Sequence, residues 1–132
     1  MVMWRKSRVV RAQGFTLIEL IVVMAIIALL ITIVAPRYMR NLEKSKEAVL
    51  KEDLWVMRDA LDKYYGDLGK YPNSLDELVE QKYLRAIPVD PLTDSRTTWQ
   101  VVSPADPELG AIYSVKSGAS GASTTGTAYS EW

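Results

Sequence analysis

The sequence predicts an α+β fold, in which a long N-terminal α-helix packs by its second half on a small head with a short helix and a small antiparallel β-sheet. The apolar run at residues 15–35 holds one charged residue, Glu19, in 21 positions. A helical repeat of apolar residues continues beyond this run, and two short β-rich segments follow later. The 132 residues are enough for one small domain.

The first half of the long helix is predicted to cross a membrane. Residues 15–35 would form a helix of about 31 Å, which matches the hydrocarbon core of a bilayer. Residues 1–14 form a basic leader without an acid, and positive charge stays on the cytoplasmic side. We therefore expect a single-pass membrane protein, with its N-terminus in the cytoplasm and residues 36–132 as a head on the opposite side of the membrane. The leader's basic residues are Arg5, Lys6, Arg8 and Arg11.

Composition excludes several classes of function. The chain has no cysteine and no histidine, so thiolate chemistry, disulfides and the commonest general base are absent. Residues 36–132 carry 12 basic and 15 acidic residues, a net charge of −3. A nucleic-acid-binding domain normally has the opposite sign, so no nucleic-acid partner is expected. No nucleotide loop or catalytic constellation is visible, and we expect the protein not to be an enzyme.

A single apolar stripe marks the second half of the long helix. Its members recur with the helical period, which indicates a face covered by the head. Gly66 and Gly69, followed by Tyr71-Pro72, are expected to end the helix. Pro36 lacks an amide hydrogen and should kink or loosen the helix at the membrane exit. The stripe consists of Leu50, Leu54, Met57, Leu61, Tyr64 and Leu68.

The remainder of the head is predicted to be short elements and loops. A capping box at residues 74–77 begins a short helix that ends near Tyr83-Leu84. Residues 97–102 and 111–115 are rich in β-branched and aromatic residues and are predicted to be strands. Residues 117–128 have the composition of a flexible tail. The aromatic residues beyond it, Tyr129 and Trp132, indicate that the end of the chain folds back and packs.

Three interpretations compete for the N-terminal third. A secretory signal peptide has a shorter apolar core than this one and a small-residue cleavage site after it. An ordinary signal anchor fits the hydropathy. The third interpretation depends on the junction between the leader and the apolar run, which reads Gly14, Phe15, Thr16, Leu17, Ile18, Glu19.

This junction closely resembles the prepilin signature of type IV pilins and type II secretion pseudopilins, residue for residue. The resemblance implies a type IV pilin-like fold and cleavage between Gly14 and Phe15 by a prepilin peptidase. It also implies N-methylation of Phe15 and assembly of the mature chain, through its N-terminal helix, into a helical filament of identical subunits.

The head is similar to the major, or G-type, pseudopilin of type II secretion systems. This resemblance implies a periplasmic pseudopilus that drives the export of folded proteins. The implied partners are an inner-membrane assembly platform with its ATPase, and minor pseudopilins. A type IV pilin or minor pilin, serving adhesion, motility or DNA uptake, stays open, although type IVa pilins usually carry a disulfide. A non-polymerising bitopic membrane protein also stays open. The matching residues are Tyr71-Pro72, Leu75, Leu78, Tyr83-Leu84, Pro88, Asp90, Pro91, Trp99, Ile112, Tyr113 and Trp132.

Glu19 is the one ionisable residue inside the apolar run. A carboxylate there costs at least about 2.5 kcal/mol on insertion scales unless it finds a partner. Cleavage after Gly14 would create one, the charged amine of Phe15, in the same chain or in a neighbouring one. Pairing Glu19 with that amine would neutralise two charges and define the axial register of the filament. The alternative is a carboxylate that merely lies at the membrane interface.

Calcium is the one cofactor that the resemblance implies. G-type pseudopilins typically hold one ion in the C-terminal loop through aspartates and backbone carbonyls. The matching residues here, 117–128, contain no carboxylate, and the nearest acids are Asp106, Glu108 and Glu131. Calcium takes about six to eight oxygen ligands, and its affinity rises with their charge. We therefore expect no tight metal site, with a weak one in this loop left open, and packing of Tyr129 and Trp132 in its place.

Overall fold

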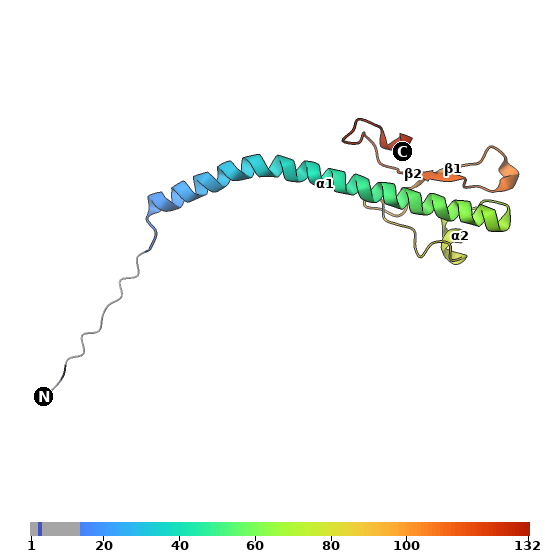
Figure 1. The fold of residues 1–132 in the computed structure, drawn as a ribbon, viewed down its shortest axis with the longest axis horizontal. Helices are drawn as coiled ribbons and strands as arrows, with labels where there is room; N and C mark the ends of the chain where they lie inside the picture. Colours follow the sequence, from blue (N-terminus) through green and yellow to red (C-terminus); the bar gives the residue numbers. More distant parts are fainter. Residues whose placement is uncertain (1–2, 4–13) are drawn as a thin grey trace. The chain divides into compact units, whose positions relative to one another are not determined.

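The computed structural model describes Met3 and residues 14–132, and it divides into two compact units, residues 1–37 and 38–132. Most of the predicted leader, residues 1–2 and 4–13, lies outside the described residues. The elements are α1 (Leu17–Leu68), α2 (Leu75–Glu80), β1 (Gln100–Val102), η1 (Pro107–Leu109), β2 (Ser114–Lys116) and η2 (Tyr129–Glu131). The helices, the strands and their order along the chain confirm the α+β fold (Figure 1).

Helix α1 contains 52 residues and continues through Pro36 without a break in its assignment. The kink or loosening that the sequence predicts at Pro36 therefore stays a prediction. In the first unit, the apolar side chains of α1 are all exposed, and no part of the most apolar window is buried. An apolar helix surface of this length needs a bilayer or other apolar helices around it.

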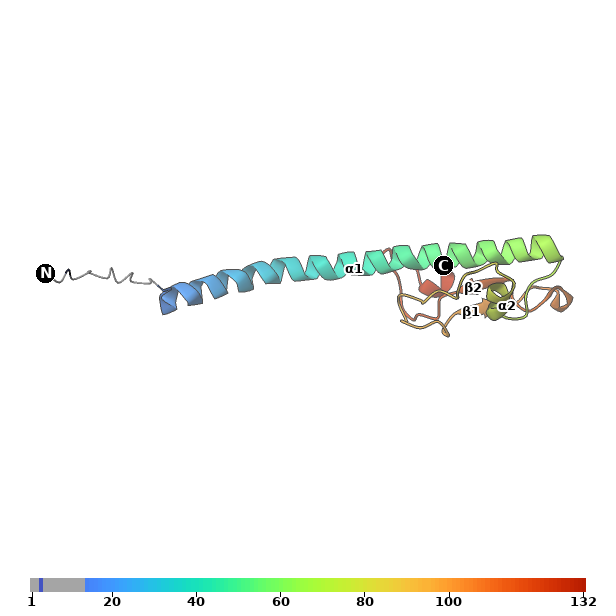
Figure 2. The same cartoon turned by 90° about the horizontal axis from the view of Figure 1, so that it is seen from below.

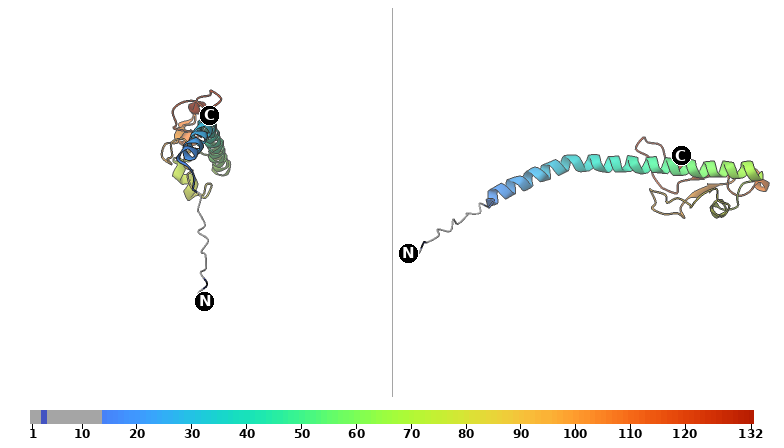
Figure 3. Two further views of the ribbon diagram at one scale, coloured as in Figure 1. Left: turned by 90° about the vertical axis from the view of Figure 1, so that its left-hand side faces the viewer. Right: turned by 60° about the horizontal axis from the view of Figure 1, so that its bottom comes forward.

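In the second unit, α1 buries one stripe against the head, as the helical period predicts. Figures 2 and 3 show α2 and both strands on the same side of this half of α1. Leu50, Met57 and Leu61 are completely buried, and Leu54 and Tyr64 are nearly so. Leu68 was expected to continue the stripe, but its side chain is 50% exposed. The prediction was wrong there because Leu68 is the last residue of α1, beyond the part that the head covers.

Both ends of the connection between α1 and α2 follow local rules. Gly69 adopts a φ of 69°, and its N–H bonds to the carbonyl of Tyr65, which closes the last turn of α1. The hydroxyl of Ser74 accepts the N–H of Glu77 at 3.3 Å, as in a capping box. The Glu77 carboxylate bonds the N–H of Asn73 at 3.1 Å, one residue earlier than the motif predicts. Helix α2 ends at Glu80, short of the predicted Tyr83-Leu84.

Strands β1 and β2 form a two-stranded antiparallel sheet in which Val101 pairs with Val115. Both strands were predicted, but longer, over residues 97–102 and 111–115. The first residues of the second predicted strand bond elsewhere, since the N–H groups of Ala111 and Ile112 both donate to the carbonyl of Pro72. Pro72 thereby joins the turn after α1 to the segment before β2.

Gly110 permits this close approach. Its φ is 121°, and a β-carbon built on it would lie 2.2 Å from the carbonyl oxygen of Tyr71. We expect Gly110→Ala to cost at least about 2 kcal/mol, because it combines a backbone conformation reserved for glycine with a clash against backbone. Thermal unfolding of the detergent-solubilised chain should show a midpoint lower by about 8–16 °C.

Gly66→Ala is the matched control for Gly110→Ala. Gly66 lies inside α1, and a β-carbon there meets nothing within 4 Å. Alanine should stabilise the helix by about 0.5–1 kcal/mol. Equal melting temperatures for the two variants would show that the close contact at Gly110 does not affect the stability of the fold.

Candidate functional site

The start of α1 carries the first candidate site, and its geometry is local. The N–H of Thr16 donates to Glu19 Oε2 at 2.9 Å, and the N–H of Glu19 donates to the Thr16 hydroxyl at 3.2 Å. These two bonds are a reciprocal capping box, which satisfies amide groups that a helix start leaves free. Glu19 also lies in the first turn, where the helix dipole favours negative charge.

This arrangement gives Glu19 a partner before any cleavage. The Thr-x-x-Glu spacing at the start of α1 is a sequence signal for this capping role, in addition to being part of the prepilin signature. Glu19 Oε2 accepts a hydrogen bond from the N–H of Thr16. Cleavage after Gly14 would convert the backbone N–H of the residue before Thr16, Phe15, into a free amine. Capping therefore holds the carboxylate at the end of the helix where that amine would appear.

The predicted cleavage site lies just before α1. Gly14 and Phe15 are both exposed, Phe15 to 91%. Its chain neighbours aside, a β-carbon built on Gly14 meets no atom of residues 14–132 within 4 Å, so this part of the fold does not require glycine at the position. A requirement for a small residue there would have to come from an enzyme that binds the site.

The head contains a second site, which sequence reasoning missed. Glu47 of α1 is only 7% exposed, and its carboxylate receives three hydrogen bonds from the C-terminal segment. The N–H and hydroxyl of Thr124 donate at 2.7 and 2.8 Å, and the hydroxyl of Tyr129 donates at 2.9 Å. One signal could have found it: Glu47 lies three residues before Leu50 and so continues the buried stripe by one turn.

These bonds decide the charge of the site. Burial alone raises the pKa of Glu47, but the hydrogen bonds from Thr124 and Tyr129, with the nearby charge of Lys51, outweigh it. The pKa of Glu47 is therefore lowered. Burial and the adjacent Glu47 carboxylate raise the pKa of Tyr129 to about 12. At neutral pH the carboxylate is ionised, and the phenol that donates to it keeps its proton.

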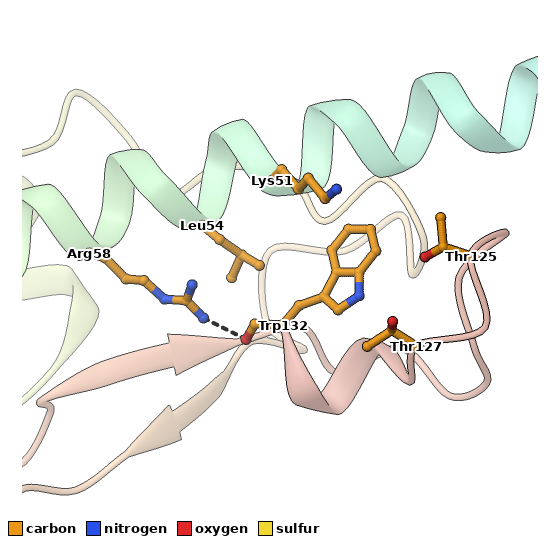
Figure 4. A pocket seen from close by; sticks show the side chains of 6 residues that line it. All are labelled: Lys51, Leu54, Arg58, Thr125, Thr127 and Trp132. Atoms are coloured by element: carbon orange, nitrogen blue, oxygen red, sulfur yellow. Dashed lines mark hydrogen bonds between the residues drawn. The ribbon is translucent and has the colours of Figure 1, made fainter.

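Trp132 closes the same region, as predicted from the terminal aromatic pair. Its ring packs edge-to-face on Tyr129 at 5.3 Å, and the Lys51 ammonium lies 4.8 Å from the ring centroid. Arg58 Nη2 donates to the carbonyl oxygens of Val115 and Trp132 at 2.9 and 2.7 Å. Figure 4 shows Trp132 between Lys51 of α1 and Thr127. These three side chains line a cleft of about 330 Å³. The predicted flexible tail is thus attached to α1 at several points.

The residues around this loop do not fit calcium. Among residues 3 and 14–132, no three acids gather as a metal site would need. The groups that face Glu47 are N–H and O–H donors, which favour an anion and not a cation. Another acid pair in the head is Asp53 and Asp90, where burial and then the Asp90 charge raise the pKa of Asp53. Asp90 is itself occupied by the Ser117 hydroxyl and the N–H of Leu92.

The chain combines an exposed apolar helix, capped at its start by Glu19 shortly after Gly14, with a small α+β head. This combination defines a membrane-anchored filament subunit of the prepilin class. Residues 10–35 match the family described as "Prokaryotic N-terminal methylation motif". The protein called type II secretion system core protein G from Aeromonas hydrophila is 32% identical over 110 residues, 71% of this chain and 75% of that protein. Its namesake from Klebsiella pneumoniae is 34% identical, over 71% of this chain and 76% of that protein.

The core protein G of Vibrio cholerae is 29% identical over 92% of both chains. No solved structure matches this chain significantly. The chain belongs to the family of type II secretion system core protein G, the major pseudopilins.

Proposed function

We propose that this protein is the repeating structural subunit of a periplasmic pseudopilus, the filament of a type II secretion system that drives the export of folded proteins. The observation that carries this proposal is the first half of α1, an exposed apolar helix with a single carboxylate at its start. Family membership supports the secretion system over a type IV pilus.

The chain's own residues supply anchoring and assembly. The basic leader keeps the N-terminus in the cytoplasm and the apolar helix in the inner membrane. A prepilin peptidase removes residues 1–14 and methylates Phe15. The mature helix then leaves lipid for a bundle of identical helices, where its apolar surface packs again and Glu19 meets an amine. The other components of the system would be an inner-membrane assembly platform with its ATPase, and minor pseudopilins.

Two further features support a structural role. The head has a net charge of −3, which opposes binding of nucleic acid. Its buried acids, Glu47 and Asp90, are engaged in hydrogen bonds that hold the fold. The relatives are named as core proteins of a type II secretion system, and we assign this chain no reaction of its own.

Deletion of the gene in its host tests the function. We expect folded exoproteins to accumulate in the periplasm and to disappear from the medium, with surface motility unchanged. The measurement is quantitative comparison of periplasmic and extracellular proteins, with the full-length gene restored as the control. Normal secretion together with lost motility or adhesion would assign the chain to a type IV pilus instead.

A further inference from the structure

The C-terminal segment, residues 117–132, contains the loop for which the family resemblance implies a metal ion. We propose that the Glu47 carboxylate of α1 holds this segment closed and that no metal ion takes part in the closure. The inference concerns how the head is stabilised, so it stands apart from the proposed function.

The first support is the set of donors around Glu47. Oε1 accepts both the N–H of Thr124 and the hydroxyl of Tyr129, and Oε2 accepts the hydroxyl of Thr124. Hydrogen bonds to an ionised acceptor are about twice as strong as neutral ones. The carboxylate therefore joins two parts of the segment, the loop tip and η2, to one turn of α1.

The second support is the use of the loop's own carbonyls. A calcium ion bound by a loop without carboxylates would depend on backbone oxygens. Three of these carbonyls already accept hydrogen bonds within the segment: Ser123 from Gly126, Thr127 from Ser123, and Gly121 from Tyr129. Ala122 and Ala128 also pair as an antiparallel bridge. The loop tip is therefore a small hairpin, in which some of the carbonyls that a cation would need are bonded to the segment's own N–H groups.

The third support is the charge of the surroundings. Lys51 lies one turn after Glu47 and lowers the pKa of its carboxyl, and Tyr129 stays protonated in its folded position. Glu43, one turn before, acts on Tyr129 by its charge. A cation that entered here would have to displace donors directed at Glu47 and lie near the Lys51 ammonium.

The test uses the full-length chain in detergent, with calcium chloride, with EGTA, and as four variants. Glu47→Gln removes the charge and keeps the size, and Tyr129→Phe removes one donor. Glu52→Gln is the matched control, because Glu52 is an exposed acid on the same helix. Glu47→Ala shows the effect of removing the whole carboxylate. Hydrogen exchange resolves residues 119–129 separately from the core of α1, so local loosening is distinguished from failure to fold.

We expect calcium and EGTA to give the same melting temperature in the wild type. Glu47→Gln should lower the amide protection of residues 119–129 at least about tenfold, since it weakens three charge-assisted bonds. Tyr129→Phe should lower it less, and Glu52→Gln not at all. The protein should also lose loop protection as the pH falls below about 4.5, because a lowered pKa stabilises the fold only while the carboxyl is ionised. Glu47→Gln should abolish this pH dependence.

Two results would overturn the proposal. One is a melting temperature that rises by several degrees with micromolar calcium, or loop protection that EGTA removes. The other is a Glu47→Gln protein whose loop stays as protected as that of Glu52→Gln. If Glu47→Ala does not fold, the milder variants Glu47→Gln and Tyr129→Phe still distinguish these outcomes from the expected ones.

Discussion

Replacing Gly14 with leucine should leave nearly all of the protein in its uncleaved form and abolish filaments. The expected cause lies in recognition by the peptidase, which must accept a small residue before the cleaved bond. The described part of the fold gives no reason for the effect, because Gly14 is exposed and a β-carbon there meets no atom of the described residues within 4 Å, its chain neighbours aside. Intact mass of the membrane-extracted protein is the measurement. The wild type should begin at Phe15 and be heavier by one methyl substitution than the unmodified mature chain.

Gly14→Ala serves as the graded control, since alanine is the next smallest residue. It should be cleaved at least in part. A wild-type protein that keeps residues 1–14 in cells with an active prepilin peptidase would contradict the assignment of the cleavage site. Complete cleavage of the leucine variant would show that size at this position does not matter.

Replacing Glu19 with alanine should leave membrane insertion intact and almost eliminate filaments. Insertion is expected to improve slightly, because a polar group is removed from an apolar helix. Assembly should be weakened, because each subunit then brings the Phe15 amine into the helix bundle without the Glu19 carboxylate that would pair with it. Breaking a buried ion pair in this way costs about 3 kcal/mol or more, which is over a hundredfold in an equilibrium constant. The measurement is the filament yield in sheared fractions, normalised to the amount of cleaved subunit in the membrane.

Two further variants separate the two roles that the structure gives Glu19. Glutamine can still accept the N–H of Thr16, so Glu19→Gln keeps the capping box and removes only the charge. Thr16→Ala removes the capping hydroxyl and keeps the charge. Loss of filaments in the Gln variant, with near-normal yield in the Thr16 variant, is the expected pattern. Normal assembly by Glu19→Gln would mean that capping, and not charge pairing, is what assembly requires.

Much of the fold could be predicted from local patterns. The period of the apolar residues between Leu50 and Tyr64 identified the buried face of α1, because a helix brings every third or fourth residue to the same side. Both predicted strands began three residues too early, at residues 97 and 111 in place of 100 and 114. Pro72 accepts the N–H groups of Ala111 and Ile112, and this competition with strand pairing depends on a residue some 40 positions earlier.

The candidate sites also divide into those that depend on nearby residues and those that depend on residues far apart in the sequence. Gly14, Phe15 and Glu19 could be chosen from sequence because their chemistry depends on adjacent residues and on the apolar run that follows. Glu47 was not chosen, although its place in the stripe, one turn before Leu50, is visible in the sequence. A glutamate at the end of an apolar stripe is usually solvated, and only its donors distinguish it from Glu43 or Glu52.

The sequence by itself determined the membrane helix, the junction of the leader with it, the buried stripe of α1 and the return of the terminal aromatics. These features follow from hydropathy, helical period and composition, which act over a few turns of chain. Only the tertiary structure decided how residues 117–132 are held. The hydrogen bonds from Thr124 and Tyr129 to Glu47 join residues 77 and 82 positions apart. The physical reason is that a Gly/Ser/Thr loop has no preferred conformation of its own, so its shape depends on the carboxylate that a distant helix presents to it.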